Sequence, residues 1–143
     1  MKRAVMLSLI LPATLVAGFA TAADMKLESA WARSSPPGAQ VAAVYLRIDN
    51  TGGKSDRLLT ITSDVAASAE VHRTTVVDGV ARMRPVSTLH VGANEVVAFE
   101  PGGLHIMLFG LKQPLVTGQT FDLKMQFEVA GTLQVKVLVR TPD

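Results

Sequence analysis

The sequence contains no cysteine. This absence excludes disulfide bonds, thiolate nucleophiles, thioredoxin-like redox chemistry, zinc–thiolate sites and the cysteine-ligated blue-copper site. Any metal ion that this chain binds must therefore be held by imidazole, thioether or carboxylate groups.

The chain also lacks an apolar run long enough to span a membrane. Its longest apolar run covers residues 5–19, contains Pro12, and falls short of the roughly 18 residues that a span needs. The basic residues Lys2 and Arg3 precede this run, and Ala-Thr-Ala at residues 20–22 follows it. This order of segments is typical of a secretory signal peptide that is cleaved after the small residues.

A surplus of charge of one sign is missing as well. The chain has 14 basic and 12 acidic residues, and removal of a signal peptide at residues 1–22 takes away two basic residues and leaves 12 of each sign. The remaining residues 23–143 are expected to form a single exported, soluble domain. A near-neutral domain without a basic stripe is not expected to bind nucleic acid. Stable membrane insertion after signal cleavage is not expected either.

The expected domain contains a series of short β-rich runs that alternate between apolar and polar residues. They cover residues 41–49, 57–62, 71–77, 80–86, 95–99, 104–109, 121–129 and 133–139. Glycine, proline and asparagine residues between the runs are typical of turns. The pattern predicts an all-β fold, either an antiparallel β-sandwich or a barrel, and leaves open one short helix at residues 114–118.

One hairpin can be predicted in detail because Asp78-Gly79 is a strong signal for a two-residue turn. Such a turn places Met83 opposite Thr74, which is two residues after His72. Side chains alternate along a strand, so His72 and Met83 then lie on one face as diagonal neighbours, roughly 7 Å apart at their Cα atoms. A three-residue loop would instead flip the faces of one strand.

Three arginines alternate with these candidate ligands on the same hairpin. The alternation sends Arg73, Arg82 and Arg84 to the face opposite His72. A solvated surface is the simpler interpretation, because exposed charge is the default state of arginine. The alternative is a docking patch for an acidic partner.

A second strand adds another histidine and another methionine. His105 and Met107 are two residues apart and therefore share one face of this strand. Together with His72 and Met83 they offer two imidazoles and two thioethers. This soft and uncharged ligand set suits Cu(I) better than Mg²⁺, Ca²⁺ or Mn²⁺ and somewhat better than Zn²⁺. The four residues are therefore the candidate metal ligands, in a site expected near the surface at one end of the sandwich.

Each of these residues taken alone also has an ordinary structural interpretation. A strand histidine is commonly a hydrogen-bonded structural residue, and a strand methionine commonly fills the core. Their joint occurrence favours a metal site. Three other residues are left out of it: His90 has no soft partner nearby, Met25 lies near the start of the expected domain, and Met125 continues an apolar face.

The order His72, ten residues, Met83, twenty-one residues, His105, one residue, Met107 resembles the H-x10-M-x21-H-x-M signature of the PCuAC family of periplasmic copper chaperones. Further segments that look like this family are Ala30–Arg33, Pro36–Ala39, Ala43–Leu46, Glu70–His72, Pro101–Met107 and Gly110–Leu115. The resemblance covers essentially the whole expected domain.

The resemblance implies a cupredoxin-like antiparallel β-sandwich with Greek-key topology that binds one Cu(I) through His72, Met83, His105 and Met107. It also implies a copper chaperone in the periplasm, which is not an enzyme. Delivery would serve assembly of the CuA centre in subunit II of cytochrome c oxidase, alongside a Sco-type assembly protein.

Other functions stay open from the sequence alone. A periplasmic copper-binding protein for copper homeostasis or tolerance would use the same ligands. A copper-dependent enzyme would need an open metal position and a general base, and Glu70 is the nearest carboxylate in sequence, although a solvated residue is its simpler interpretation. A metal-free interaction domain would leave the ligand spacing unexplained.

Overall fold

The computed structural model describes residues 24–141, and within this range the chain forms ten β-strands and no helix. The signal peptide expected at residues 1–22 lies outside the described residues. Residues 24–141 contain no helix that is long and apolar enough to cross a membrane. The segment at residues 114–118, where the sequence allows a short helix, ends in a turn instead.

Eight of the strands overlap the alternating runs of the sequence, whereas the strands at residues 26–33 and 89–91 lie outside them. The strands are β1 (Lys26–Arg33), β2 (Val41–Asp49), β3 (Asp56–Ser63), β4 (Ala66–Val77), β5 (Val80–Pro85), β6 (Leu89–Val91), β7 (Val96–Ala98), β8 (Leu104–Leu111), β9 (Thr120–Phe127) and β10 (Gly131–Arg140). The prediction of an all-β domain is therefore confirmed.

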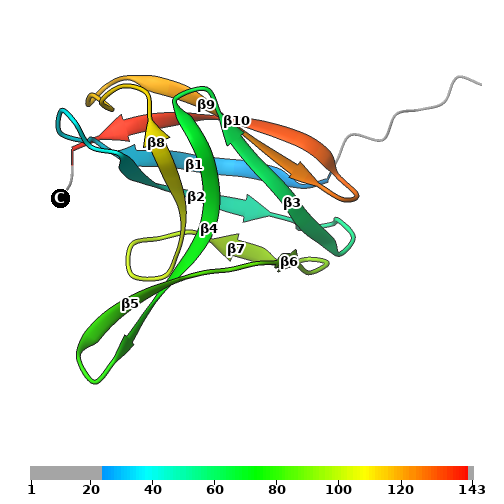
Figure 1. Ribbon diagram of the computed structural model, residues 1–143. Helices are drawn as coiled ribbons and strands as arrows, with labels where there is room; N and C mark the ends of the chain where they lie inside the picture. The colour runs from blue at the N-terminus through cyan, green and yellow to red at the C-terminus, as the bar shows by residue number, and fades with distance from the viewer. Residues whose placement is uncertain (1–23, 142–143) are drawn as a thin grey trace, which may run out of the picture.

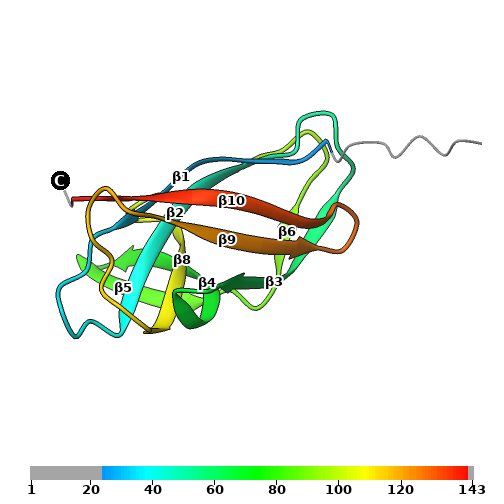
Figure 2. The same cartoon turned by 90° about the horizontal axis from the view of Figure 1, so that it is seen from above.

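The strands form one hydrogen-bonded sheet that folds over on itself (Figure 1). Their order is β5-β4-β8-β2-β1-β10-β9-β3-β6, and β7 pairs with β2. All pairs are antiparallel except β1 and β10, which run parallel with Trp31 opposite Leu138. Seen from above, β1, β10 and β9 lie on one side of the molecule and β4, β5 and β8 on the other (Figure 2). β2 thus links the two sides, because it pairs with β8 along one edge and with β1 along the other.

The core lies between the two layers and is built by alternating apolar residues. On β9, Phe121, Leu123, Met125 and Phe127 point inward and are buried, while the residues between them are partly or fully exposed. On β8, by contrast, apolar and candidate ligand side chains alternate. Its inward residues, among them Ile106, are fully buried, and the opposite face is left for the site.

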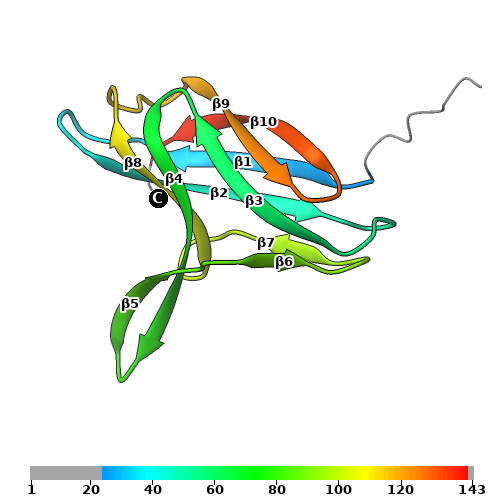
Figure 3. The same ribbon diagram turned by 45° about the vertical axis from the view of Figure 1, so that its right-hand side comes forward.

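The predicted hairpin has the predicted turn. Asp78 and Gly79 both adopt positive φ angles, 51° and 74°, as a two-residue turn of the mirror-image type requires. β4 and β5 then pair with Val77 opposite Val80, and the register continues along the whole of β5. In Figure 3, β5 and the outer half of β4 project from the body of the domain. We call residues 73–84 the arm.

A buried carboxylate anchors the opposite end of the sandwich. Asp56, at the start of β3, is 7% exposed and accepts hydrogen bonds from the backbone N–H groups of Val129, Ala130 and Arg57 at 2.7–2.9 Å. Burial raises the pKa of Asp56, but the backbone N–H donors more than offset this effect, so its pKa lies below the ordinary value of 3.8. The carboxylate thereby fixes the β9–β10 turn against β3.

Replacement of Asp56 tests this anchor. Because the folded state depresses the pKa, the carboxylate stabilises the fold above about pH 4, and this contribution is lost as the pH falls through the folded-state pKa. Asp56→Ala is expected to lower the free energy of unfolding by about 2 kcal/mol at pH 7, and by less at pH 3. Urea denaturation at both pH values measures the difference.

The matched control is Asp64→Ala, which alters an exposed aspartate in the β3–β4 turn. It is expected to change the free energy of unfolding by less than about 0.5 kcal/mol. Equal losses in the two variants, or a loss for Asp56→Ala that does not depend on pH, would show that the carboxylate is not an anchor.

Candidate metal centre

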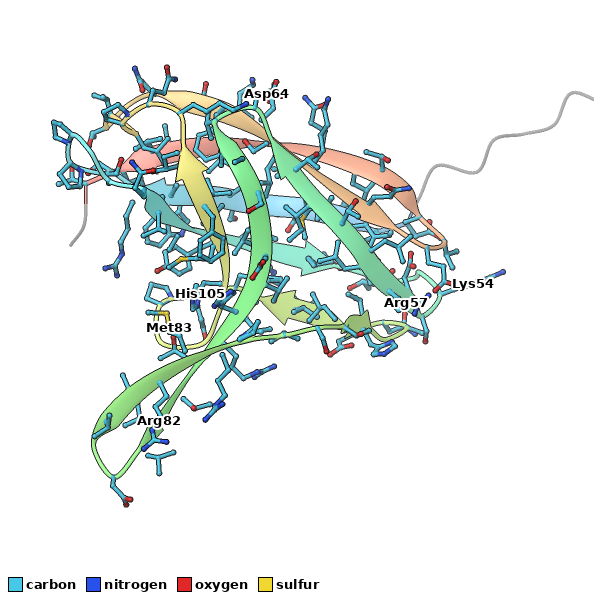
Figure 4. The ribbon with its side chains drawn as sticks, in the orientation of Figure 1. Lys54, Arg57, Asp64, Arg82, Met83 and His105 are labelled. Carbon is cyan, nitrogen blue, oxygen red and sulfur yellow. The ribbon has the colours of Figure 1, made fainter. Side chains whose placement is uncertain are left out.

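The four candidate ligands come from three neighbouring strands at one end of the sheet. His72 lies on β4, Met83 on β5, and His105 and Met107 on β8. The strands are adjacent in the order β5-β4-β8, so residues far apart in sequence share one surface. Figure 4 shows Met83 and His105 at the base of the arm, where it leaves the body of the domain.

The register of these strands places the candidate ligands on one face. His72 is directly opposite His105 across β4 and β8, and Met107 is opposite Glu70. On the other side of β4, Met83 is opposite Thr74, as the turn at Asp78-Gly79 predicts. Thr74 and Glu70 are each two residues from His72, so all these side chains leave the sheet on the same side.

The two histidine rings are close together. Their centroids are 6.0 Å apart. His105 is only 5% exposed, and its Nδ1 lies 3.2 Å from the backbone oxygen of Gly103. Since a carbonyl only accepts, Nδ1 of His105 donates this hydrogen bond, which leaves the lone pair of the neutral ring on Nε2. A metal ligand whose other ring nitrogen is bonded in this way is fixed in both tautomer and orientation.

His72 has different neighbours. Its Nε2 lies 3.1 Å from Oε2 of Glu70, and its ring centroid is 5.7 Å from that of Phe109. Its side chain is 14% exposed, whereas that of Glu70 is 55% exposed. In the neutral ring, donation from Nε2 to the carboxylate leaves the lone pair on Nδ1. The glutamate therefore contacts the site through His72, as a neighbour of a candidate ligand.

The two methionines differ in their exposure to solvent. Met83, at the base of the arm, is 58% exposed. Met107 is half-buried and borders a hollow of about 220 Å³ together with Arg33 and Pro36, among others. Met83 is therefore the most accessible of the four candidate ligands, while the histidine rings are held in place by their neighbours.

The chemistry of this face is that of soft, neutral donors. Residues 24–141 contain no group of three or more His, Cys, Asp and Glu side chains placed to hold a metal ion. The structure brings the two histidines together directly and places the two methionines on the same face beside them. That all four bind one ion stays a prediction.

The residues left out of the predicted site lie elsewhere. Met25 and Met125 are buried in the core, 4% and 0% exposed. His90 is exposed on β6, where it pairs with Arg57 of β3. The burial of Met125 agrees with its predicted place on an apolar face.

Two features of the site were missed by the sequence reasoning. The carbonyl of Gly103 orients His105, and no sequence pattern marks a backbone group for this role. The ring of Phe109 lies against His72. Alternation along β8 places Phe109 on the same face as His105 and Met107, but its contact with another strand depends on the register between β4 and β8.

Comparisons with known proteins find similarity over most of the chain. The model of the family described as "Putative lipoprotein LpqE-like" matches residues 25–139. The chain is 30% identical to the "Putative lipoprotein Lxx21020" of Leifsonia xyli subsp. xyli over 131 residues, which cover 91% of this chain and 78% of that protein.

Solved structures with the same fold include the copper-bound PCuAC domain from PmoF2. It is 22% identical, with a TM-score of 0.71, and the match covers 85% of this chain and 97% of that one. The solution structure of CuI-DR1885 from Deinococcus radiodurans is 28% identical, with a TM-score of 0.65, over 80% of this chain and 76% of that one. These similarities confirm the predicted cupredoxin-like fold.

The different burial of the candidate ligands can be tested on the metal-free protein. His105→Ala removes a buried ring and its hydrogen bond to the Gly103 carbonyl, which keeps only the bond from the Thr74 N–H. It is therefore expected to lower the free energy of unfolding by about 1–3 kcal/mol. Met83→Ala alters an exposed side chain and is expected to cost less than about 0.5 kcal/mol. Urea denaturation in the presence of a metal chelator measures both changes. An unchanged free energy of unfolding in His105→Ala would contradict the burial and the hydrogen bond of this ring.

Proposed function

The chain belongs to the LpqE-like family, and from this premise we propose that it is an exported copper chaperone that binds one Cu(I) through His72, Met83, His105 and Met107. The observation that most strongly supports this proposal is the direct pairing of His72 with His105 on adjacent strands, with both methionines on the same face. The protein acts as a carrier in this proposal, and copper is its cargo.

The donor chemistry supports Cu(I) as that cargo. Imidazole and thioether groups are neutral when they bind, and thioether sulfur is a soft donor that prefers Cu(I) to hard divalent ions. Because the chain has no cysteine, the site contains no thiolate that an oxidising compartment would convert to a disulfide. A His₂Met₂ site therefore suits a copper carrier outside the cytoplasm.

The distribution of burial supports transfer as the purpose of the site. His105 is held by the Gly103 carbonyl and His72 is packed against Phe109, so the two imidazoles form a fixed base. Met83 is exposed, and a ligand from a recipient protein can replace its sulfur without any opening of the core. Such stepwise ligand exchange delivers the ion without releasing it to solvent.

The relatives support the same assignment. CuI-DR1885, which is named for bound Cu(I), is 28% identical to this chain. The copper-bound PCuAC domain from PmoF2 shares the fold. We propose copper as the ion because these similar proteins are named for bound copper and because this chain has the ligand spacing of the PCuAC signature.

The place of action and the recipient are part of the proposal as well. The amino-terminal pattern of an exported protein, and the lipoprotein names of its relatives, support action in the periplasm. We propose delivery of Cu(I) for assembly of the CuA centre in subunit II of cytochrome c oxidase, directly or together with a Sco-type protein. This recipient follows from the resemblance of the ligand spacing to the PCuAC family.

A Cu(I) competition titration tests the binding site. The protein from residue 23 onward is titrated against a chromophoric Cu(I) chelator under reducing conditions. The wild type is expected to bind one Cu(I) tightly. Met83→Leu/Met107→Leu removes both thioethers at nearly constant side-chain volume and is expected to weaken binding by more than about 100-fold.

The matched control is Met25→Leu/Met125→Leu, the same chemical change made at two core methionines. It is expected to keep wild-type copper affinity. Equal affinities for the wild type and Met83→Leu/Met107→Leu would show that these methionines are not ligands, and the proposed site would have to be abandoned.

A further inference from the structure

The arm, residues 73–84, differs from every other paired segment of the sheet. β4 pairs with β8 only as far as Arg73, which is opposite Leu104, whereas its pairing with β5 continues to Val77. Beyond Arg73 the two strands therefore contact mainly each other and project from the body (Figure 3). A two-stranded ribbon of this kind has little burial to stabilise it, so its exposed surface calls for a functional explanation.

One face of this ribbon concentrates positive charge. Arg73 and Arg84 are directly opposite each other across β4 and β5, and Arg82 follows two residues from Arg84 on the same face. All three are exposed. Like charges placed directly opposite each other destabilise a strand pair, so this arrangement works against the stability of the hairpin.

Nothing in the described part of the chain compensates these charges. The ion pairs found within residues 24–141 join Arg57 to Glu128, Lys136 to Asp122 and His72 to Glu70, and none involves the three arginines of the arm. Three uncompensated arginines on a protruding surface are suited to an anion supplied from outside. Arginine is also enriched at the centres of protein interfaces.

We infer that Arg73, Arg82 and Arg84 form a docking site for an acidic surface patch of the protein that receives the copper. This inference rests on the proposed function, because the recipient is defined there. Carboxylates of the partner would pair with the guanidinium groups, and the exposed side chains of Val77 and Val80, on the same face, would supply apolar contacts at the tip. Positive charge on the arm would also steer the two proteins together.

The tip of the arm favours a protein partner over a lipid surface. Asp78 occupies the turn, next to the exposed Val77 and Val80. Insertion of this tip into an anionic bilayer would bring the carboxylate against the lipid phosphates and remove it from water. At a protein surface the same carboxylate can stay hydrated at the rim of the contact.

The docking site is linked to the candidate copper ligands through β5. Met83 lies between Arg82 and Arg84 in sequence and points to the opposite face of the ribbon. In Figure 4, Met83 is on the side of the arm towards His105, and Arg82 lies away from it. A partner bound to the arginine face therefore holds the strand that carries the most exposed candidate ligand.

The first test needs neither copper nor an identified recipient. Poly-L-glutamate is titrated into the ¹⁵N-labelled protein at low salt while amide signals are followed by NMR. Signals of residues 73–84 are expected to shift, and salt at about 0.15 M is expected to weaken the effect. Arg82→Gln/Arg84→Gln is expected to weaken binding by about tenfold.

The matched control is Arg47→Gln/Arg57→Gln, which removes the same charge from two exposed arginines outside the arm. It is expected to bind poly-L-glutamate nearly as the wild type does. Equal weakening in both double variants, or shifts spread evenly over the surface, would overturn the docking site. Binding of the arm to phosphatidylglycerol vesicles but not to poly-L-glutamate would overturn it in favour of a lipid surface.

A second test separates the docking site from the proposed recipient. Cu(I) transfer is measured from the loaded protein to the soluble CuA domain of cytochrome c oxidase subunit II from the same organism, and to a small chelator. Arg82→Gln/Arg84→Gln is expected to slow transfer to the domain about tenfold at low salt and to leave transfer to the chelator unchanged.

The two ideas fail in different ways. If the wild type binds Cu(I) but delivers none to the CuA domain, the proposed recipient is wrong, and the poly-L-glutamate titration still decides the docking site. If both the wild type and Arg82→Gln/Arg84→Gln deliver copper at the same rate, the arginines of the arm are not a docking site for this recipient.

Discussion

The antiparallel register between β4 and β8 sets His72 directly opposite His105, and the whole candidate site depends on this alignment. A shift by one residue would turn the ligand face of one strand into the core and bring buried apolar side chains to the surface. Val71 and Ile106, which pair on the inner face, oppose such a shift because both are buried against the second layer. The hydrophobic core thereby fixes the positions of the candidate ligands on the opposite face of the same strands.

Much of this arrangement could be predicted from local sequence. The Asp78-Gly79 turn specified the pairing of β4 with β5, and alternation then placed His72 and Met83 on one face, as observed. Alternation along β8 gave the shared face of His105 and Met107 in the same way. These predictions succeeded because a two-residue turn and the period of a strand are properties of neighbouring residues.

The rest depended on contacts between segments far apart in the chain. The pairing of β1 with β10 is parallel, and β1 is further obscured by an irregular register between Glu28 and Trp31, where Ser29 has a φ of 52°. Such a bulge interrupts the alternation that reveals a strand. The contact between Glu70 and His72 and the bond from His105 to the Gly103 carbonyl were equally hidden, because they depend on side-chain orientation. The binding of copper by the four residues is still a prediction.

The uneven burial of the four candidate ligands has a physical consequence for a carrier. A site that is rigid throughout holds its ion but releases it slowly, whereas a site that is mobile throughout pays the conformational entropy of ordering every ligand. Here the two histidines are ordered before the ion arrives, one by the Gly103 carbonyl and the other by contacts with Glu70 and Phe109. Only Met83 lies on a projecting ribbon. In the proposed carrier, exchange at this one ligand would open the site while the imidazoles keep the ion in place, so a single fold would combine retention with transfer.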